Sequence, residues 1–305
     1  MGTSDGDTTP APGIGRVTWL GSEARHDTAV HGGEAIRFRV GDVEFDGSHG
    51  QGSSPDRFLV RKHRPLVEAY LSALTAVPNP NVVEVGLADG GSLALAVLAT
   101  EPHRHVGLEL DPHRLGALDE LIARCGAGDR FRTHFGVDQA DRRRVAEIVD
   151  AEFGDAPLDV VIDDASHLLE PTRATFEVLF PRLRPGGVYL IEDWNWDHLL
   201  ARGLAAAIAG EASEEHSGVV ARLPTATSER VAVAAATAPL SILVIELVLA
   251  QAESDEVVAG VEIGPWAVSV TRGPADLDHR SFRLTDHFGD HLRLHPREPG
   301  IGSVY

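Results

Sequence analysis

Two short acidic segments hold the side chains best suited to chemistry. One reads Asp163-Asp164-Ala165-Ser166-His167 and the other Glu192-Asp193-Trp194, and each follows an apolar run typical of a buried strand. Four carboxylates gathered in one place would repel one another unless a cation lay between them. A hard divalent cation such as Mg²⁺ prefers oxygen ligands and would relieve that repulsion. A neighbouring histidine suits proton transfer near neutral pH, so the two segments predict a cation-assisted reaction with a general base.

A glycine-rich turn upstream predicts a cofactor site. It reads Glu84-Val-Gly86-Leu-Ala-Asp89-Gly90-Gly91-Ser92 between an apolar strand and an apolar helix. Glycine allows close approach of a backbone to a ligand, but the spacing is not that of G-x-G-x-x-G. Carboxylates beside this turn would oppose a pyrophosphate at the helix N-terminus, whereas S-adenosylmethionine has no phosphate and carries a sulfonium and an ammonium. We therefore expect this cofactor, with Glu84, Gly86, Gly90 and Ser92 as binding residues.

The next two strands end in further candidate cofactor residues. Glu109 ends the second strand, where an acidic residue can bind both ribose hydroxyls. Asp111 follows it and could instead cap the next helix. Asp138 and Gln139 follow the third strand, where adenine contacts are expected, although Asp138 fits a helix cap equally well. Asp163 points to the face opposite Asp164 in an extended strand, so we assign it to the cofactor side or to structure.

A repeating strand–helix pattern from Asn81 positions these residues. Strands VVEVG, HVGLEL, FRTHFG, LDVVIDD and GVYLIED alternate with helices SLALAVLAT, Pro112–Arg124, Asp141–Phe153 and Pro171–Leu183. Such alternation predicts a parallel sheet covered on both faces. Right-handed crossovers bring the strand ends to one edge, where ligands bind. After a helix at Ser241–Ala252, the runs Glu256–Ile263 and Trp266–Thr271 are separated only by Gly264-Pro265, which predicts an antiparallel pair.

We divide the chain into four regions. Residues 1–14 are expected to be a disordered tail, and 15–80 an N-terminal extension for acceptor recognition or oligomer contacts. The extension is predicted to hold strands Gly15–Leu20, Ala35–Val40 and Val43–Asp46 and a helix Arg57–Leu74. Residues 81–275 form the cofactor-binding domain, with a helix-rich insert over 197–216, and 276–305 form a C-terminal segment.

The composition excludes several classes of partner. The net charge of −19 should repel nucleic acid and anionic membranes. No run of eighteen apolar residues is present, which argues against a membrane-spanning helix. Cys125 is the sole cysteine and cannot form an internal disulfide. A cytoplasmic protein is expected.

The order of these motifs resembles a known family. E-x-G…G-G-S, G-x-E, G-x-D-Q, D-x-V-x-x-D-D-x-S-H and L-x-P-G-G-x-Y-x-x-E-D-W are similar to class I S-adenosylmethionine-dependent methyltransferases over about residues 60–195. The resemblance is greatest to the metal-dependent sugar O-methyltransferases of macrolide and aminocoumarin biosynthesis, with cephalosporin hydroxylase-like relatives. It implies a Rossmann-like α/β fold, a seven-stranded, mostly parallel sheet with a C-terminal antiparallel hairpin. It also implies Mg²⁺ ligands at Asp164, Glu192 and Asp193, a general base at His167 and a possible homo-oligomer. Ala165 departs from the glycine of many relatives.

The expected function is therefore an O-methyltransferase acting on a hydroxyl, or a vicinal diol, of a sugar-like or glycosylated natural product. A catechol-type methyltransferase, an NAD-linked oxidoreductase and a cofactor-binding protein without catalysis remain alternatives. The acidic turn argues against NAD. His167 could instead be a loop or helix-cap residue, and Trp194 and Trp196 fit either an acceptor pocket or the core.

Overall fold

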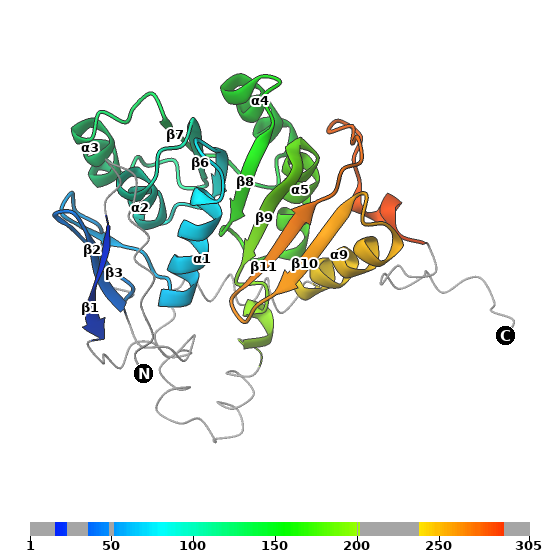
Figure 1. Ribbon diagram of the computed structural model, residues 1–305, viewed down its shortest axis with the longest axis horizontal. Helices are drawn as coiled ribbons and strands as arrows, with labels where there is room; N and C mark the ends of the chain where they lie inside the picture. The colour runs from blue at the N-terminus through cyan, green and yellow to red at the C-terminus, as the bar shows by residue number, and fades with distance from the viewer. Residues whose placement is uncertain (1–15, 23–35, 49–51, 200, 202–237, 290–305) are drawn as a thin grey trace, which may run out of the picture.

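The computed structural model describes residues 16–22, 36–48, 52–199, 201 and 238–289. A seven-stranded sheet with helices on both faces lies beside a smaller four-stranded sheet formed by the N-terminal extension (Figure 1). The predicted tail at 1–14, most of the insert predicted at 197–216 and the end of the C-terminal segment fall outside the described residues. None of the described helices is long and apolar enough to cross a membrane.

The large sheet has the topology expected from the sequence. Its strands are β5 (Asn81–Val85), β6 (Arg104–Glu109), β7 (Phe131–Phe135), β8 (Leu158–Asp163), β9 (Leu183–Glu192), β10 (Val258–Ile263) and β11 (Ala267–Arg272). They lie in the order β10-β11-β9-β8-β5-β6-β7. Neighbouring strands from β9 through β7 are parallel, whereas β11 is antiparallel to both β9 and β10. The predicted mostly parallel sheet with a C-terminal hairpin is confirmed, and the strand order reverses at β5, where ligands bind in such sheets.

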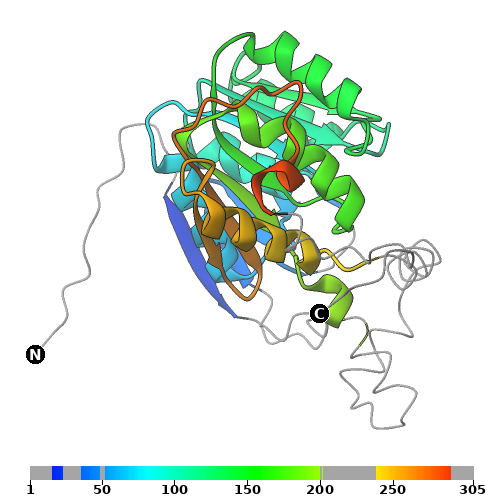
Figure 2. The same ribbon diagram turned by 90° about the vertical axis from the view of Figure 1, so that its right-hand side faces the viewer.

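Alternating side chains of the central strands divide the core into two layers. Val83 and Val161 pack with α4 (Arg142–Phe153), α5 (Leu169–Leu179) and α9 (Ser241–Glu253). Their neighbours Val82 and Val160 pack on the other face with α1 (Arg64–Thr75), α2 (Gly91–Ala99) and α3 (Gly116–Arg124). This follows from the two-residue period of a strand, which places successive side chains on opposite faces. Figure 2 faces α9, which lies against β10 at the outer edge of the sheet.

The N-terminal extension forms a small sheet of its own. It consists of β1 (Val17–Ser22), β2 (Ile36–Val40), β3 (Val43–Asp46) and β4 (Arg57–Leu59), with β4 parallel to β3 and the other pairs antiparallel. Phe38 and Phe45 stack with their ring centroids 4.9 Å apart. Both are buried in the cluster that also includes α1 and α2, so the extension is packed against the cofactor-binding domain.

The predicted helix Arg57–Leu74 was wrong in its first part. Arg57–Leu59 is strand β4, and Phe58 and Leu59 are buried with the apolar side chains of the small sheet. The helix begins only at Arg64, with Pro65 in its first turn. Proline lacks a backbone N–H and has a helical φ, so it is suited to that position. The burial of β4 therefore overrides the helical pattern of the sequence before this proline.

Two other predicted helix boundaries also differ. The helix expected at Pro112 begins at Gly116. The helix predicted to run from Pro171 to Leu183 instead spans Leu169–Leu179 and is followed by a 3₁₀ turn at Phe180–Arg182. Pro181 lies in that turn, where it cannot donate the hydrogen bond that a continuing α-helix requires. β9 consequently begins at Leu183.

Two glycines bring other backbone segments close to the cofactor turn. A Cβ atom added at Gly91 would lie 2.0 Å from the carbonyl oxygen of Leu59, at the end of β4. A Cβ at Gly86, which has a φ of +90°, would lie 2.3 Å from the carbonyl oxygen of Asp164. Neither approach is compatible with a larger side chain. The turn is therefore fixed between the N-terminal extension and the tip of β8.

The packing at Gly91 predicts a stability difference between two glycine variants. Gly91→Ala should lower the free energy of unfolding by about 1–3 kcal/mol, the usual cost of overpacking, because Leu59 is backbone and cannot rotate away. Gly116→Ala is the matched control, since Gly116 also begins a helix but a Cβ there meets nothing within 4 Å. Urea denaturation would measure both variants. Equal midpoints would contradict the close contact with Leu59.

Candidate active site

The site lies where the carboxyl ends of β5, β6, β8 and β9 meet the cofactor turn. Backbone hydrogen bonds fix the tip of β5 on both sides. Gly86 N donates to Leu108 O at 2.8 Å, and Asp164 N donates to Val85 O at 2.9 Å. The candidate cofactor and cation residues are thus brought to one edge of the sheet by its hydrogen bonding.

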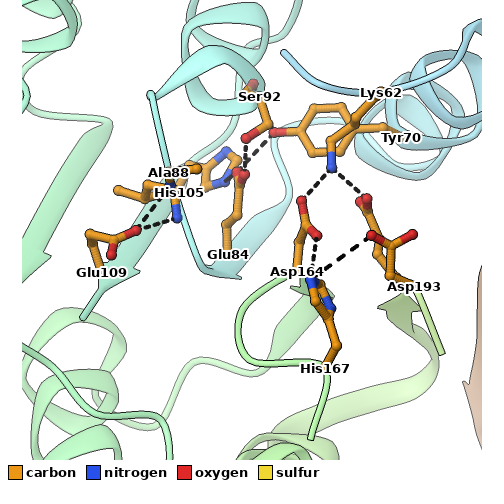
Figure 3. A network of polar contacts seen from close by, with 12 residues as sticks. Lys62, Tyr70, Glu84, Ala88, Ser92, His105, Glu109, Asp164, His167 and Asp193 are labelled. Carbon is orange, nitrogen blue, oxygen red and sulfur yellow. Dashed lines mark hydrogen bonds and ion pairs between the residues drawn. The ribbon is translucent and has the colours of Figure 1, made fainter. Parts of the chain in front are cut away.

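Asp164, His167 and Asp193 converge at this edge (Figure 3). His167 Nε2 lies 4.0 Å from Asp164 Oδ1 and 3.9 Å from Asp193 Oδ2. One ligand atom from each of the three residues lies within 4.8 Å of those of the other two, and all three side chains are partly buried. The two carboxylate oxygens are ligands that a hard divalent cation prefers, and the imidazole nitrogen beside them suits proton transfer. The two carboxylates therefore fit a single cation, with His167 next to it.

Strained backbone conformations help to aim two of these side chains. His167 has a φ of +56° and Asp193 a φ of +50°. Positive φ is uncommon for residues other than glycine and costs free energy, so it persists where the surrounding structure enforces it. At Asp193 the backbone N–H is held by Trp266 O at 2.8 Å, which connects the end of β9 to the turn between β10 and β11.

Lys62 is a site residue that the sequence analysis missed. Its Nζ donates to Asp164 Oδ2 at 2.7 Å and to Glu192 Oε2 at 2.5 Å (Figure 3). The lysine and glutamate side chains are each only 3% exposed. A sequence signal was present, because Lys62 is the sole lysine in a chain whose lysines and arginines number 27. The ammonium of a lysine is compact, whereas the guanidinium of an arginine is planar and larger. A lone lysine among many arginines therefore indicates a position that requires the ammonium.

The electrostatics of this pair follow from burial and charge. Burial raises the pKa of Glu192 to about 8, with the Asp164 carboxylate adding to the shift and Lys62 opposing it. Burial alone would lower the pKa of Lys62, but the charges of Asp164 and Glu192 outweigh it and the pKa is raised. Lys62 therefore carries a positive charge between the two carboxylates.

Glu192 was predicted to bind the metal with Asp164 and Asp193. The structure places it beside them but outside the three-residue group, with its carboxylate bonded to Lys62. Asp164 has contacts on both sides, since Oδ2 accepts from Lys62 and Oδ1 faces His167. The acidic residues of β8 and β9 thus surround an ammonium as well as the candidate cation position.

Glu84 and Ser92 support the cofactor turn from the interior. Glu84 is 1% exposed and accepts hydrogen bonds from Tyr70 OH at 2.9 Å and from Ser92 Oγ. His105 Nε2 lies 3.1 Å from the same carboxylate. Burial and the charge of Glu84 raise the pKa of Tyr70 well above its ordinary value, so the phenol stays a donor. These predicted cofactor residues are joined to helix α1 by a buried polar network.

Glu109 lies on the other side of the turn. Its Oε2 accepts from Leu87 N at 2.8 Å and Ala88 N at 3.0 Å, and its Oε1 accepts from Asp111 N at 2.9 Å. The carboxylate is partly exposed at the end of β6. Glu109 therefore lies where β6 meets the glycine-rich turn, and its ribose role stays a prediction.

The remaining predicted cofactor residues differ in exposure. Asp138 is exposed, and its Oδ1 accepts from Ala140 N at 2.8 Å, a local turn contact. Gln139 is buried, donates to Asp163 Oδ1 at 3.2 Å and accepts from Ser166 N at 2.8 Å. Burial raises the pKa of Asp163 to about 7, although hydrogen bonds from Tyr189 and Gln139 oppose the shift. Asp163 and Gln139 thus support the loop that carries His167.

Trp194 is attached to the C-terminal hairpin. Its Nε1 donates to Gly264 O at 3.0 Å, and its ring packs partly buried against the main core. Trp266, in the same hairpin turn, lies against His63 with ring centroids 4.8 Å apart. For Trp194 the structure favours a core contact.

Comparison with known proteins agrees with this geometry. Residues 83–194 match the model of a family described as a methyltransferase domain. That range contains the glycine-rich turn, the ends of β5 to β9 and the acidic cluster. Residues 83–194 are thus similar in sequence to a methyltransferase domain.

Relatives of the domain are sugar O-methyltransferases. A stretch of 157 residues is 45% identical to 8-demethyl-8-alpha-L-rhamnosyl tetracenomycin-C 2'-O-methyltransferase of Streptomyces olivaceus, covering 42% of each chain. A stretch of 56 residues is 50% identical to demethylmacrocin O-methyltransferase of Streptomyces fradiae, covering 18% of this chain and 13% of that one. A structure of the mycinamycin-pathway methyltransferase MycE, described as a complex with Mg and SAH, aligns at 24% identity and a TM-score of 0.45 over 68% of this chain and 49% of that one. The chain spans less than half the length of these relatives.

The buried polar network around Glu84 predicts the effect of removing one hydroxyl. Tyr70→Phe should lower the free energy of unfolding by about 1.5–3 kcal/mol, because a hydrogen bond to a buried charged group is lost. Chemical denaturation would measure the change. An unchanged midpoint would show that Glu84 does not depend on Tyr70 for its stabilisation.

Proposed function

We propose that the chain is an S-adenosylmethionine-dependent O-methyltransferase that uses Mg²⁺ and acts on a hydroxyl of a sugar-like or glycosylated natural product. The observation that carries the proposal is the convergence of Asp164, His167 and Asp193 beside the glycine-rich turn of a methyltransferase domain. The similarity to O-methyltransferases named for demethylmacrocin and for a rhamnosyl tetracenomycin supports this class of acceptor. A vicinal diol would allow two-point binding of the acceptor.

The cofactor would lie along the turn between Gly86 and Gly90. The absence of a side chain at Gly86 lets the turn lie directly against the backbone of Asp164, so a cofactor bound along the turn would lie close to the acidic cluster. We assign Glu109, at the end of β6, to hydrogen bonds with the ribose hydroxyls, and Asp138, which is exposed after β7, to the region of the adenine. The four other predicted cofactor residues are buried, and we propose that they support the backbone that would contact the cofactor: Glu84, Ser92, Gln139 and Asp163.

The donor set fits a divalent cation. Asp164 and Asp193 offer carboxylate oxygens at the carboxyl-terminal edge of the large sheet, and Glu192 adds a third carboxyl group next to them. When bound, the cation would lower the pKa of an acceptor hydroxyl, as it does for water. The protein residues would hold that hydroxyl in line with the sulfonium methyl, and orientation of the two reactants supplies much of the rate.

His167 is the proposed general base. Its Nε2 is farther from Asp164 and Asp193 than a hydrogen bond, so it can accept a proton. The acceptor oxygen forms a bond to the methyl carbon as the carbon–sulfur bond breaks, and its proton passes to His167. The products are the methyl ether and S-adenosylhomocysteine, with the proton later released to water.

Replacing His167 tests this assignment. His167→Ala should reduce kcat by about 10²–10⁴-fold, the usual contribution of a general base, while S-adenosylhomocysteine binding and the melting temperature stay unchanged. Mass spectrometry with a panel of rhamnosylated and deoxysugar-bearing acceptors would measure methyl transfer. The control is His103→Ala, an exposed residue before β6. Full turnover in the His167 variant would remove it from the mechanism.

Removal of divalent cations tests the second part of the proposal. Treatment with EDTA should abolish turnover, and excess Mg²⁺ should restore it, because the acidic cluster requires the cation to bind and acidify the acceptor. Calorimetric titration with S-adenosylhomocysteine in the same buffers shows whether the cofactor site persists. Turnover that continues in EDTA would exclude a cation-dependent reaction and favour catalysis by His167 alone.

A further inference from the structure

Three consecutive residues between β4 and α1 contact three different parts of the site edge. Arg61 NH2 lies 2.5 Å from Asp89 Oδ2 in the cofactor turn. Lys62 contacts Asp164 and Glu192 at the ends of β8 and β9. His63 packs on Trp266 in the hairpin turn. The N-terminal extension therefore contributes directly to the geometry of the site.

Lys62 restrains the carboxylates on one side only. It donates to Oδ2 of Asp164, which leaves Oδ1 of the same residue on the side of His167 and Asp193. An aspartate without such a partner could rotate and turn either oxygen towards the cluster. The ammonium is fully buried and has three donors, so it can fix the acidic side chains of both strands at once.

The charges of the cluster are also balanced by this lysine. Three acidic side chains, Asp164, Glu192 and Asp193, lie here together with one ammonium, that of Lys62. The ammonium offsets part of the negative charge of the acidic side chains, and a divalent cation bound beside Asp164 and Asp193 would offset more of it.

We propose that Lys62 is a positioning residue of the cation site, which orients Asp164 and Glu192 so that the cation meets a preformed set of oxygens. This inference rests on the proposed cation-dependent function. For a variant without Lys62, the proposal and simple electrostatics predict opposite changes in cation affinity. Coulomb's law alone says that removal of a nearby positive charge strengthens cation binding, whereas loss of an orienting partner weakens it, typically 10–100-fold.

Calorimetric titration with Mn²⁺ distinguishes the two effects. The wild type should bind one Mn²⁺, and Lys62→Met should bind it about 10–100-fold more weakly. The matched control, Arg61→Met, removes a positive charge from the adjacent residue, whose partner is Asp89, and should retain the wild-type Mn²⁺ affinity. Equal or tighter binding by Lys62→Met would overturn the proposal. Absence of Mn²⁺ binding by the wild type would instead overturn the proposed cation-dependent function.

A measurement on the wild type covers the case in which Lys62→Met does not fold. Because the chain has a single lysine, labelling with ¹³Cε-lysine gives a single side-chain NMR signal from Lys62. Mg²⁺ should shift this signal, with a midpoint that matches the affinity measured by calorimetric titration with Mg²⁺, and the shift should disappear in Asp193→Asn. A signal that stays in place while calorimetry shows that Mg²⁺ binds would overturn the role of Lys62.

Discussion

The concentration of negative charge at the ends of β8 and β9 is the constraint on which the site depends. Two adjacent parallel strands place Asp164 and Glu192 side by side, and burial makes an uncompensated charge there costly. The ammonium of Lys62 compensates it from outside the strand–helix repeat. The extension before the domain is thus tied to the electrostatics at its most charged edge.

A second polar layer lies beneath the reactive surface. Glu84 joins the cofactor turn to α1 through Tyr70, and Gln139 joins the end of β7 to the His167 loop through Ser166. Buried groups of this kind are satisfied by one another. The bond from Ser166 to Gln139 supports the loop of His167, whose backbone conformation would be unfavourable in isolation.

The alternating pattern of the sequence predicted the large sheet because most of its strands are rich in apolar residues and glycine or proline marks several of the turns. The convergence of Asp164, His167 and Asp193 followed from the same topology, since parallel strands share one edge. Strand β4 could not be predicted in this way. Its three residues read as part of a helix, and only their pairing with β3 and burial under α2 make them extended.

Side-chain partners were harder to predict than positions. Glu84 and Gln139 occupy the expected elements, but which atoms they bond depends on Tyr70, His105 and Ser166, which are distant in sequence. Lys62 is 102 residues from Asp164 and 130 from Glu192 along the chain. No local sequence pattern predicts an ion pair between residues so far apart. The composition did show that Lys62 is the sole lysine.

The antiparallel direction of β11 has a consequence for how such an enzyme could diversify. Because β11 runs against β9, Ala267 pairs with Glu192, and the Gly264–Trp266 turn comes to the same edge as the acidic cluster. Trp266 O holds Asp193 N, and Gly264 O holds the indole of Trp194. An insertion in this short connection would displace the Asp193 carboxylate together with the indole of Trp194, so changes in chain length are better tolerated in segments that do not share these bonds.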